Sequence, residues 1–344
     1  ESILRHADYE VPADVEIALW GSTDGITRTV PVDEDFAWLL GLFVAEGSTS
    51  SVCPMIHNAD EELIDRAADC IRDTLGHDPG RRWSNDAYEL RFPAVFREVL
   101  YDIGFEDAES YDSSEKIVPE CLLHAPRKII LSFLRGLLAG DGSEPKNDNY
   151  STVQFHTTSD DVKDGVVFLL HRLGLVSNVS TKTERAGNRQ DIHTISVSGG
   201  ASDNPLRRVL DGDDPYHPKS LVVSIPPALF ELRSMAIDDI KQIIPKYLKR
   251  RENISLEKLS EIVDRLEQRD LPSAASQHLE TLRQLTNSDL SYLRVTDIER
   301  VEYEGHLYDL QVGGEPIFLS NWLYAHNSMD APLVMSSRID PSEI

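Results

Sequence analysis

Two short segments of the chain place an acidic residue between an apolar, helix-like run and a glycine. LLGLFVAEGS spans residues 39–48 and LRGLLAGDGS spans residues 134–143, with Glu46 and Asp141 immediately before the glycine. Carboxylate oxygens are the ligands that hard divalent cations such as Mg²⁺ take in proteins, and such a cation can promote the hydrolysis of a phosphodiester. The repetition therefore predicts a metal site that takes one carboxylate from each copy.

Small residues in both copies indicate how the two acids come together. Gly41 and Ala45 lie four residues apart in the first copy, as do Gly136 and Gly140 in the second. Small residues at this spacing let two helices pack closely, and the glycine after each acid would supply the left-handed residue that ends its helix. Two carboxylates at the negative ends of two adjacent helices repel each other, and a divalent cation relieves that repulsion. A buried helix that ends at a glycine would explain one copy, but the two matching copies favour the metal site.

The segments that follow each copy also match. After the first come an amphipathic helical pattern, EELIDRAADCIRDTLG, and an alternating segment, YELRF; after the second come DDVKDGVVFLLHRLG and HTISVSG. Periods of 3.6 and 2 residues indicate a helix and a strand in each case. The chain therefore contains a duplicated α/β unit.

The duplicated region, about residues 34–200, resembles the LAGLIDADG, or dodecapeptide, homing endonucleases. The resemblance implies an α+β fold of two pseudo-symmetric αββαββα repeats, Mg²⁺ bound by Glu46 and Asp141, and double-stranded DNA bound along the sheets. It also implies that Lys116, in the segment EKIVPE, assists near the scissile phosphate, with Lys182 as its pseudo-symmetric counterpart. Glu46 stands where the family more often has Asp, which keeps a metal-binding carboxylate. A relative that binds DNA without cutting it is an alternative.

The segments LYDLQV, IFLSN and YAHNS near the C-terminus resemble the final motifs of inteins. Asn327 can attack its own main-chain carbonyl, form a succinimide and cut the peptide bond to Ser328. His326 can donate a proton to the leaving amide, and the hydroxyl of Ser328 is the nucleophile that receives the upstream segment. The resemblance implies that Asp309 helps to coordinate these steps. Pro316 stands where the family often has His.

Both ends of the sequence indicate a fragment of a longer precursor. The first residue is Glu1, and no Cys-initiated splicing block precedes the first acidic motif. The last segment, SMDAPLVMSSRIDPSEI, resembles the large subunit of the archaeal family D DNA polymerases, which implies a host with DNA polymerase and exonuclease activity. The expected partners are the host polymerase sequences, the missing N-terminal half of the intein, and DNA of the intein-free gene. A polymerase fragment with an insertion inert in both chemistries is the other alternative.

These patterns predict a multidomain α+β protein with a helical connector and the C-terminal part of a β-rich Hint splicing domain. The predicted parts are a remnant of the N-terminal splicing region at 1–33, the two-repeat endonuclease at 34–200, the connector at 201–294, the splicing segment at 295–327 and the host sequence at 328–344.

The composition limits where such a protein can work. The 344 residues include 34 Lys and Arg against 59 Asp and Glu, a net charge of −25. In ordinary salt this excess would oppose DNA binding, but molar salt screens it within a few ångströms, so we expect a halophilic, haloarchaeal-like host. The three cysteines lack CxxC spacing and predict buried thiols in a reducing compartment. With no apolar run of membrane-spanning length and no signal segment, we expect a cytosolic monomer without a membrane partner.

Overall fold

The computed structural model describes most of the chain up to residue 287 and a few short stretches beyond it. It divides into two compact units, Glu1–Tyr292 and Leu293–Ile344. Within its described part, no helix is both long enough and apolar enough to cross a membrane. The described residues are 15–49, 53–105, 113–146, 150–183, 191–200, 204–212, 222–235, 237–246, 248, 253–287, 298, 300–302, 304–305, 317–320 and 323–326.

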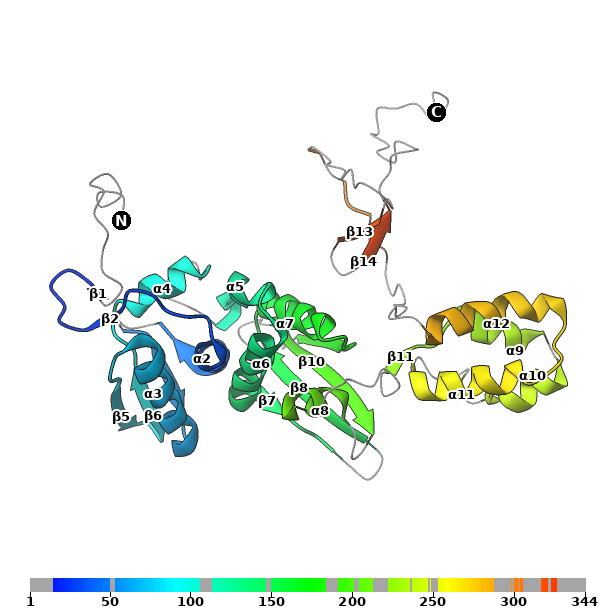
Figure 1. The fold of residues 1–344 in the computed structure, drawn as a ribbon, viewed down its shortest axis with the longest axis horizontal. Helices are drawn as coiled ribbons and strands as arrows, with labels where there is room; N and C mark the ends of the chain where they lie inside the picture. The colour runs from blue at the N-terminus through cyan, green and yellow to red at the C-terminus, as the bar shows by residue number, and fades with distance from the viewer. Residues whose placement is uncertain are drawn as a thin grey trace. The chain divides into compact units, whose positions relative to one another are not determined.

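The first unit begins with a short hairpin and two copies of one α/β arrangement (Figure 1). Each copy places a helix before a four-stranded antiparallel sheet, and the strand orders, β3-β4-β6-β5 and β7-β8-β10-β9, correspond. The hairpin and first copy comprise β1 (Glu16–Ala18), β2 (Gly25–Thr27), α2 (Glu34–Glu46), β3 (Gly47–Ser48), β4 (Met55–Asn58), α3 (Glu61–Leu75), β5 (Gly80–Ser84), β6 (Ala87–Arg91) and α4 (Phe96–Asp102). The second comprises η1 (Ser113–Glu115), α5 (Glu120–Leu123), α6 (Arg127–Asp141), β7 (Gly142–Ser143), β8 (Tyr150–Thr157), α7 (Asp160–Arg172), β9 (Asn178–Thr183), β10 (Asp191–Gly200) and α8 (Pro205–Asp211).

Polar side chains cap four of these helices, among them α2, α3 and α7. The carboxylate of Asp33 accepts the backbone N–H of Phe36 at the start of α2, at 2.9 Å. Asp60 and Ser159 do the same at the starts of α3 and α7, which occupy equivalent places in the two copies. Such caps satisfy N–H groups that have no partner inside the helix. The equivalent caps show that the duplication extends to the local folding signals.

Helices α2 and α6 pack with their backbones in contact. A Cβ atom on Gly41 would overlap the carbonyl oxygen of Phe133, and one on Gly136 would overlap the carbonyl oxygen of Trp38. On α6, a Cβ at Gly140 would overlap the Cβ of Ala45. Only glycine permits this approach, so the small residues do form the expected close helix interface.

The glycines that follow the two acids do not adopt the left-handed conformation that the sequence led us to expect. Gly47 (φ −77°) and Gly142 (φ −90°) are extended and begin strands β3 and β7. A Cβ at these positions would overlap the carbonyl oxygens of Phe43 and Leu138 in the preceding helix turn. Glycine is therefore needed for the sharp turn from helix into strand, and not for a positive φ.

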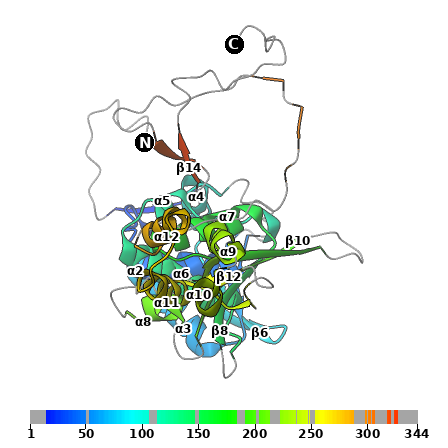
Figure 2. The ribbon, with the colours of Figure 1, turned by 90° about the vertical axis from the view of Figure 1, so that its right-hand side faces the viewer.

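Each sheet buries one face against the helices. In the first sheet Ile56 pairs with Leu90, and in the second Phe155 pairs with Ile195; all four side chains are buried. Successive residues of a strand point to opposite faces, so the rows beside these pairs lie on the other, open face. Strand β10 is ten residues long. Along the middle of this strand (Figure 2), buried residues alternate with partly exposed ones.

The first hydrophobic core extends beyond residues 34–200 on both sides. Ile26 of β2 belongs to it, as do Leu206, Val209 and Leu210 of α8. The guanidinium of Arg135, on α6, donates to the carbonyl oxygen of Leu210 through Nε at 2.8 Å. Helix α8 is thus part of the packed second repeat.

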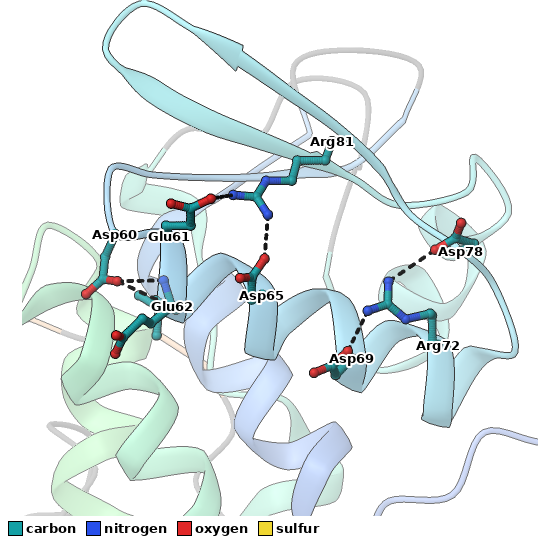
Figure 3. A network of polar contacts seen from close by, with 9 residues as sticks. Asp60, Glu61, Glu62, Asp65, Asp69, Arg72, Asp78 and Arg81 are labelled. Carbon is teal, nitrogen blue, oxygen red and sulfur yellow. Dashed lines mark hydrogen bonds and ion pairs between the residues drawn. The ribbon is translucent and has the colours of Figure 1, made fainter.

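Two charged clusters join α3 to strand β5 and to the segment that leads into it (Figure 3). Arg81, on β5, forms an ion pair with Glu61 at 2.9 Å and another with Asp65. Arg72 pairs with Asp69 and, at 3.1 Å, with Asp78. Part of the acidic excess thus lies on the outer side of this helix, away from the open face of the sheet.

A second hydrophobic core follows, built mainly from helices. Strands β11 (Val222–Ser224) and β12 (Asn253–Ser255) pair with each other. The apolar faces of the helices supply the remaining core residues. These helices are α9 (Pro227–Ser234), α10 (Asp238–Ile243), α11 (Leu256–Glu267) and α12 (Ser273–Thr286).

Only one of the three cysteines matches the expected burial. Cys70, on α3, is buried, and burial raises the pKa of its thiol to about 12. Cys53 is half-buried and Cys121 is exposed. The expectation of three buried thiols is therefore wrong for Cys121, which lies on the outer side of the one-turn helix α5.

Replacing Gly136 by Ala tests the helix interface. The added methyl group would press against the backbone of α2, and we expect the free energy of unfolding to fall by about 1 to 3 kcal/mol. Gly80→Ala is the matched control, because its Cβ would meet only the Cβ of Arg91 at 3.8 Å, an ordinary contact. Urea denaturation of both variants provides the measurement, and equal stabilities would contradict the close packing.

Candidate metal centre

The two predicted acids lie at equivalent helix ends and act on each other. Glu46 is the last residue of α2, and Asp141 is the last residue of α6. Burial, and next the negative charge of Asp141, raise the pKa of the Glu46 carboxyl. Burial of the carboxyl also raises the pKa of Asp141, although the residue keeps an exposed side. The helix interface therefore brings two carboxylates into mutual repulsion.

Asn58 holds the Glu46 carboxylate and was not identified from the sequence. Its Nδ2 donates to Oε1 of Glu46 at 2.9 Å, and its own Oδ1 accepts the backbone N–H of Asp60 at 2.8 Å. The second bond turns the amide so that its NH₂ group faces Glu46. The sequence feature that could have identified Asn58 is its place at the end of a strand, two residues before the capping residue Asp60. In the second copy Thr157 takes that place, and its hydroxyl accepts the N–H of Ser159 at 3.1 Å.

Lys116 lies beside the two carboxylates. Its Nζ donates to the carbonyl oxygen of Ala45 at 2.7 Å, next to Glu46. Burial lowers the pKa of the Lys116 ammonium, whereas the charges of Asp141 and Glu46 act to raise it. The hydroxyl of Ser159 donates to the backbone oxygen of Lys116 at 2.5 Å and fixes this segment. One positive charge is therefore held against both acids.

The second copy supplies a histidine to the same centre. Burial has the largest effect on the pKa of Asp141 and raises it. The positive charges of Lys116 and then of His156 act in the opposite direction. His156 Nε2 lies 2.9 Å from the hydroxyl of Ser143, and its Nδ1 lies 3.2 Å from that of Thr194. A His near the end of the strand that follows the acidic motif was visible in the sequence, but its role depends on the sheet register.

Lys182 does not take the place that the sequence suggested. It pairs with Ile192 in the second sheet, which makes it the register equivalent of Ser84 in the first. Lys116 precedes its repeat's helix, whereas Lys182 lies on strand β9, so the two lysines are not pseudo-symmetric counterparts. Lys182 is also not among the groups that shift the pKa of Glu46 or Asp141.

Carboxylate ligands of this kind fit Mg²⁺. In the part of the chain that the structure describes, no three His, Cys, Asp or Glu side chains gather as a metal site. Mg²⁺ is commonly held by only one or two protein carboxylates, with waters and phosphate oxygens as the other ligands. Glu46 and Asp141 therefore suit a cation whose coordination is completed by a substrate phosphate.

The residues of the predicted splice junction are mostly outside the described residues. His326 ends β14 (Leu323–His326), and its backbone pairs with Ile317 of β13 (Ile317–Ser320). Asn327, Ser328 and Asp309 fall outside the described ranges. The hairpin supplies a regular strand that leads directly to the junction.

Comparison with known families identifies the class of this domain. Residues 128–203, which include the second acidic motif, match the family model described as a LAGLIDADG-like domain. The first repeat has the same element order, sheet topology and terminal acid. The chain therefore carries a LAGLIDADG-like domain.

Several named proteins are similar to nearly the whole chain. The DNA polymerase II large subunit of Haloquadratum walsbyi is 40% identical over 351 residues, covering 94% of this chain and 15% of that protein. The DNA-directed RNA polymerase subunit Rpo1C of Methanocaldococcus jannaschii is 24% identical, with 88% and 37% covered. The replication factor C small subunit of the same organism is 21% identical, with 88% and 16% covered. The chain thus spans between 15% and 37% of the length of these relatives.

Among solved structures, the crystal structure of I-DmoI in complex with DNA and Mn is similar at 14% identity. The match covers 53% of this chain and 94% of that chain, with a TM-score of 0.36.

Replacing Glu46 by Gln tests the repulsion at the centre. A carboxyl whose pKa is raised by folding destabilises the protein as the pH rises through that pKa, so removing one charge at pH 7 should stabilise the metal-free protein. Solvent screens the exposed side of the site, so we expect the free energy of unfolding to rise by about 1 kcal/mol. This corresponds to an increase of roughly 2 to 4 °C in Tm in EDTA. Mg²⁺ should raise the Tm of the unsubstituted protein more than that of the variant.

Thermal unfolding followed by circular dichroism, with Glu98→Gln on α4 as the control, makes this measurement. Glu98 is exposed on another helix, so its loss should alter neither the Tm in EDTA nor the response to Mg²⁺. A Glu46→Gln protein that is less stable in EDTA would exclude a repelling pair.

Proposed function

We propose that this domain makes a Mg²⁺-dependent double-strand cut in DNA, with the intein-free copy of its host gene as the target. The observation that carries the proposal is the pair of carboxylates, Glu46 and Asp141, at the ends of two packed and equivalent helices. A double-strand cut needs one reaction on each strand, and a two-fold arrangement of acids matches the two-fold relation of the strands. Glu46 and Asp141 would hold the metal.

The neighbouring side chains supply the remaining parts of the reaction. A bound Mg²⁺ polarises the scissile phosphate and favours attack by water. Lys116 holds a positive charge beside both carboxylates, suited to the charge that develops on the phosphate. Asn58 keeps Glu46 in one orientation through a hydrogen bond. The polar open faces of both sheets are suited to the major groove, which admits a two-stranded ribbon.

The relatives support a mobile insertion as the larger context. Their printed names are those of a DNA polymerase subunit, an RNA polymerase subunit and a replication factor subunit, yet each aligns with 88% or more of this chain. Three differently named proteins share this segment over a minor part of their own lengths. We infer that the segment is an intein inserted in a host, here the large subunit of a DNA polymerase II, whose polymerase and exonuclease activities belong to the host.

The second proposed activity is the C-terminal step of protein splicing. Strand β14 ends at His326, immediately before Asn327 and Ser328. Asn327 would cyclise and cut its bond to Ser328, His326 would protonate the leaving amide, and Ser328 would accept the upstream segment. Asp309 would help to coordinate these steps. Residues 295–327 would then be the C-terminal part of a Hint splicing domain.

Cleavage of a plasmid that carries the uninterrupted host gene tests the nuclease. We expect the full chain to convert supercoiled plasmid to the linear form in Mg²⁺ but not in EDTA. Glu46→Ala and Asp141→Ala should each lower the rate of linearisation by at least about 100-fold, because a site built on two carboxylates loses half of its ligands. Binding in a gel-shift assay should remain.

Glu98→Ala is the control for the loss of one acidic charge and should cut normally. Unchanged cutting by both active-site variants would refute the metal assignment. Binding without cutting by the unsubstituted chain would favour the alternative of a DNA-binding protein that has lost cleavage.

Mass spectrometry of the purified chain tests the splice junction. We expect release of the peptide 328–344, because cyclisation of Asn327 cuts the peptide bond between Asn327 and Ser328. Asn327→Ala should abolish the release, and Asn321→Ala, a nearby Asn outside the junction, should not. Release of the same peptide from Asn327→Ala would exclude the cyclisation.

A further inference from the structure

We propose that the two sheets read the two halves of the DNA target by different chemistry, the first through charged guanidinium groups and the second through neutral amide and hydroxyl groups. The inference rests on the proposed function, because it assigns how the DNA of that reaction is recognised. It names the residues that determine sequence specificity and predicts how the contribution of each to DNA binding depends on salt.

The sheet register defines which side chains can contact DNA. The pairs Ile56 with Leu90 and Phe155 with Ile195 point into the core. Residues paired in adjacent rows share the opposite face. On the first sheet, the row of His57 therefore lies on the open face, and on the second sheet the row of His156 does.

The open face of the first sheet carries charges. His57, Glu89 and Arg82 form one row, and Met55 with Arg91 forms the next. Arg82 and Arg91 are exposed, and Nη2 of Arg91 lies 3.3 Å from Oε2 of Glu89. A guanidinium binds guanine O6 and N7, or a phosphate, through two parallel hydrogen bonds. This half should prefer guanine and release counterions on binding.

The open face of the second sheet is almost uncharged. Gln154, Ser196 and Asn178 form one row, and His156 with Thr194 forms part of the next. Asn and Gln side chains pair with adenine N6 and N7, and hydroxyl groups accept or donate to several base edges. Among the described residues paired on this face, the one Lys or Arg is Lys182, which pairs with Ile192 at the far end of β9. This half should read bases with little neutralisation of phosphate.

The polar groups on the open face of the second sheet are held in a hydrogen-bonded series. Thr194 contacts His156, His156 contacts Ser143, and the hydroxyl of Ser143 donates to Oε1 of Gln154 at 3.2 Å. Ser143 follows Asp141 by two residues, so the series runs from the metal centre into the base-reading row. In the first sheet Met55 occupies the register position of Gln154, opposite Ser48. An apolar thioether cannot continue such a series, so the two halves differ in organisation as well as in charge.

The two sheets should therefore differ in how strongly salt weakens their binding to DNA. Each phosphate neutralised lowers the slope of log K against log [salt] by about 0.9. Hydrogen bonds between neutral groups release no counterions and keep their value at high salt. For a chain with a net charge of −25, the second sheet would thus retain its contribution under molar salt.

Binding-site selection with the full chain tests the proposal. The probe is a randomised double-stranded DNA library with Ca²⁺ in place of Mg²⁺, and the selected duplex is then titrated at several KCl concentrations. Arg82→Gln should relax base preference in one half of the selected site and reduce the salt slope by about one. Asn178→Ala should relax the other half and lower affinity about ten-fold, with the slope unchanged. Both side chains are exposed, so the variants should fold.

Other results would overturn the proposal. Equal changes of slope in the two variants, or a loss of preference in the same half, would show that the sheets do not differ in chemistry. Selection of no duplex by the unsubstituted chain would instead refute the proposed DNA target, and this inference with it. A selected site with both halves rich in guanine would contradict the neutral reading of the second sheet.

Discussion

Contact between the backbones of α2 and α6 is the constraint on which the rest of this domain depends. Gly41 faces the carbonyl of Phe133, and Gly136 faces the carbonyl of Trp38, so neither helix can carry a side chain there. The same contact fixes the distance between the helix ends. Larger residues would separate the helices and carry Glu46 away from Asp141, so the residues that stabilise the interface also decide whether the metal centre exists.

Repulsion between the two carboxylates of the candidate metal centre destabilises the folded protein, which is typical of sites that bind a charged ligand. Two carboxylates with raised pKa values lie at the negative ends of two helices, and Lys116 offsets only part of their charge. The large core contact between the helices compensates for this repulsion. Lys116 is held by its hydrogen bond to the carbonyl oxygen of Ala45, which keeps its ammonium group in place beside the two acids.

The sequence predicts those features that repeat or that depend on residue spacing. The two acids, the close helix faces and the order of elements follow from matched segments, and Lys116 follows from the family motif. Asn58 was missed because its contact with Glu46 requires both the end of β4 and the cap of α3 to be placed in space. Lys182 was misplaced because similarity of type does not give sheet register. The extended Gly47 was missed because a left-handed C-cap and a helix-to-strand turn both use glycine.

The two repeats have stayed alike where they touch and differ where they face outward, and packing explains this. A change at Gly41 or Gly136 affects the partner helix, so both repeats constrain the interface at once. The side chains of Arg82 and Asn178 lie on open faces, where a substitution costs little stability. After duplication, these faces can therefore diverge independently. A charged sheet and a neutral sheet on one symmetric frame would let a single chain recognise a DNA sequence that is not itself symmetric.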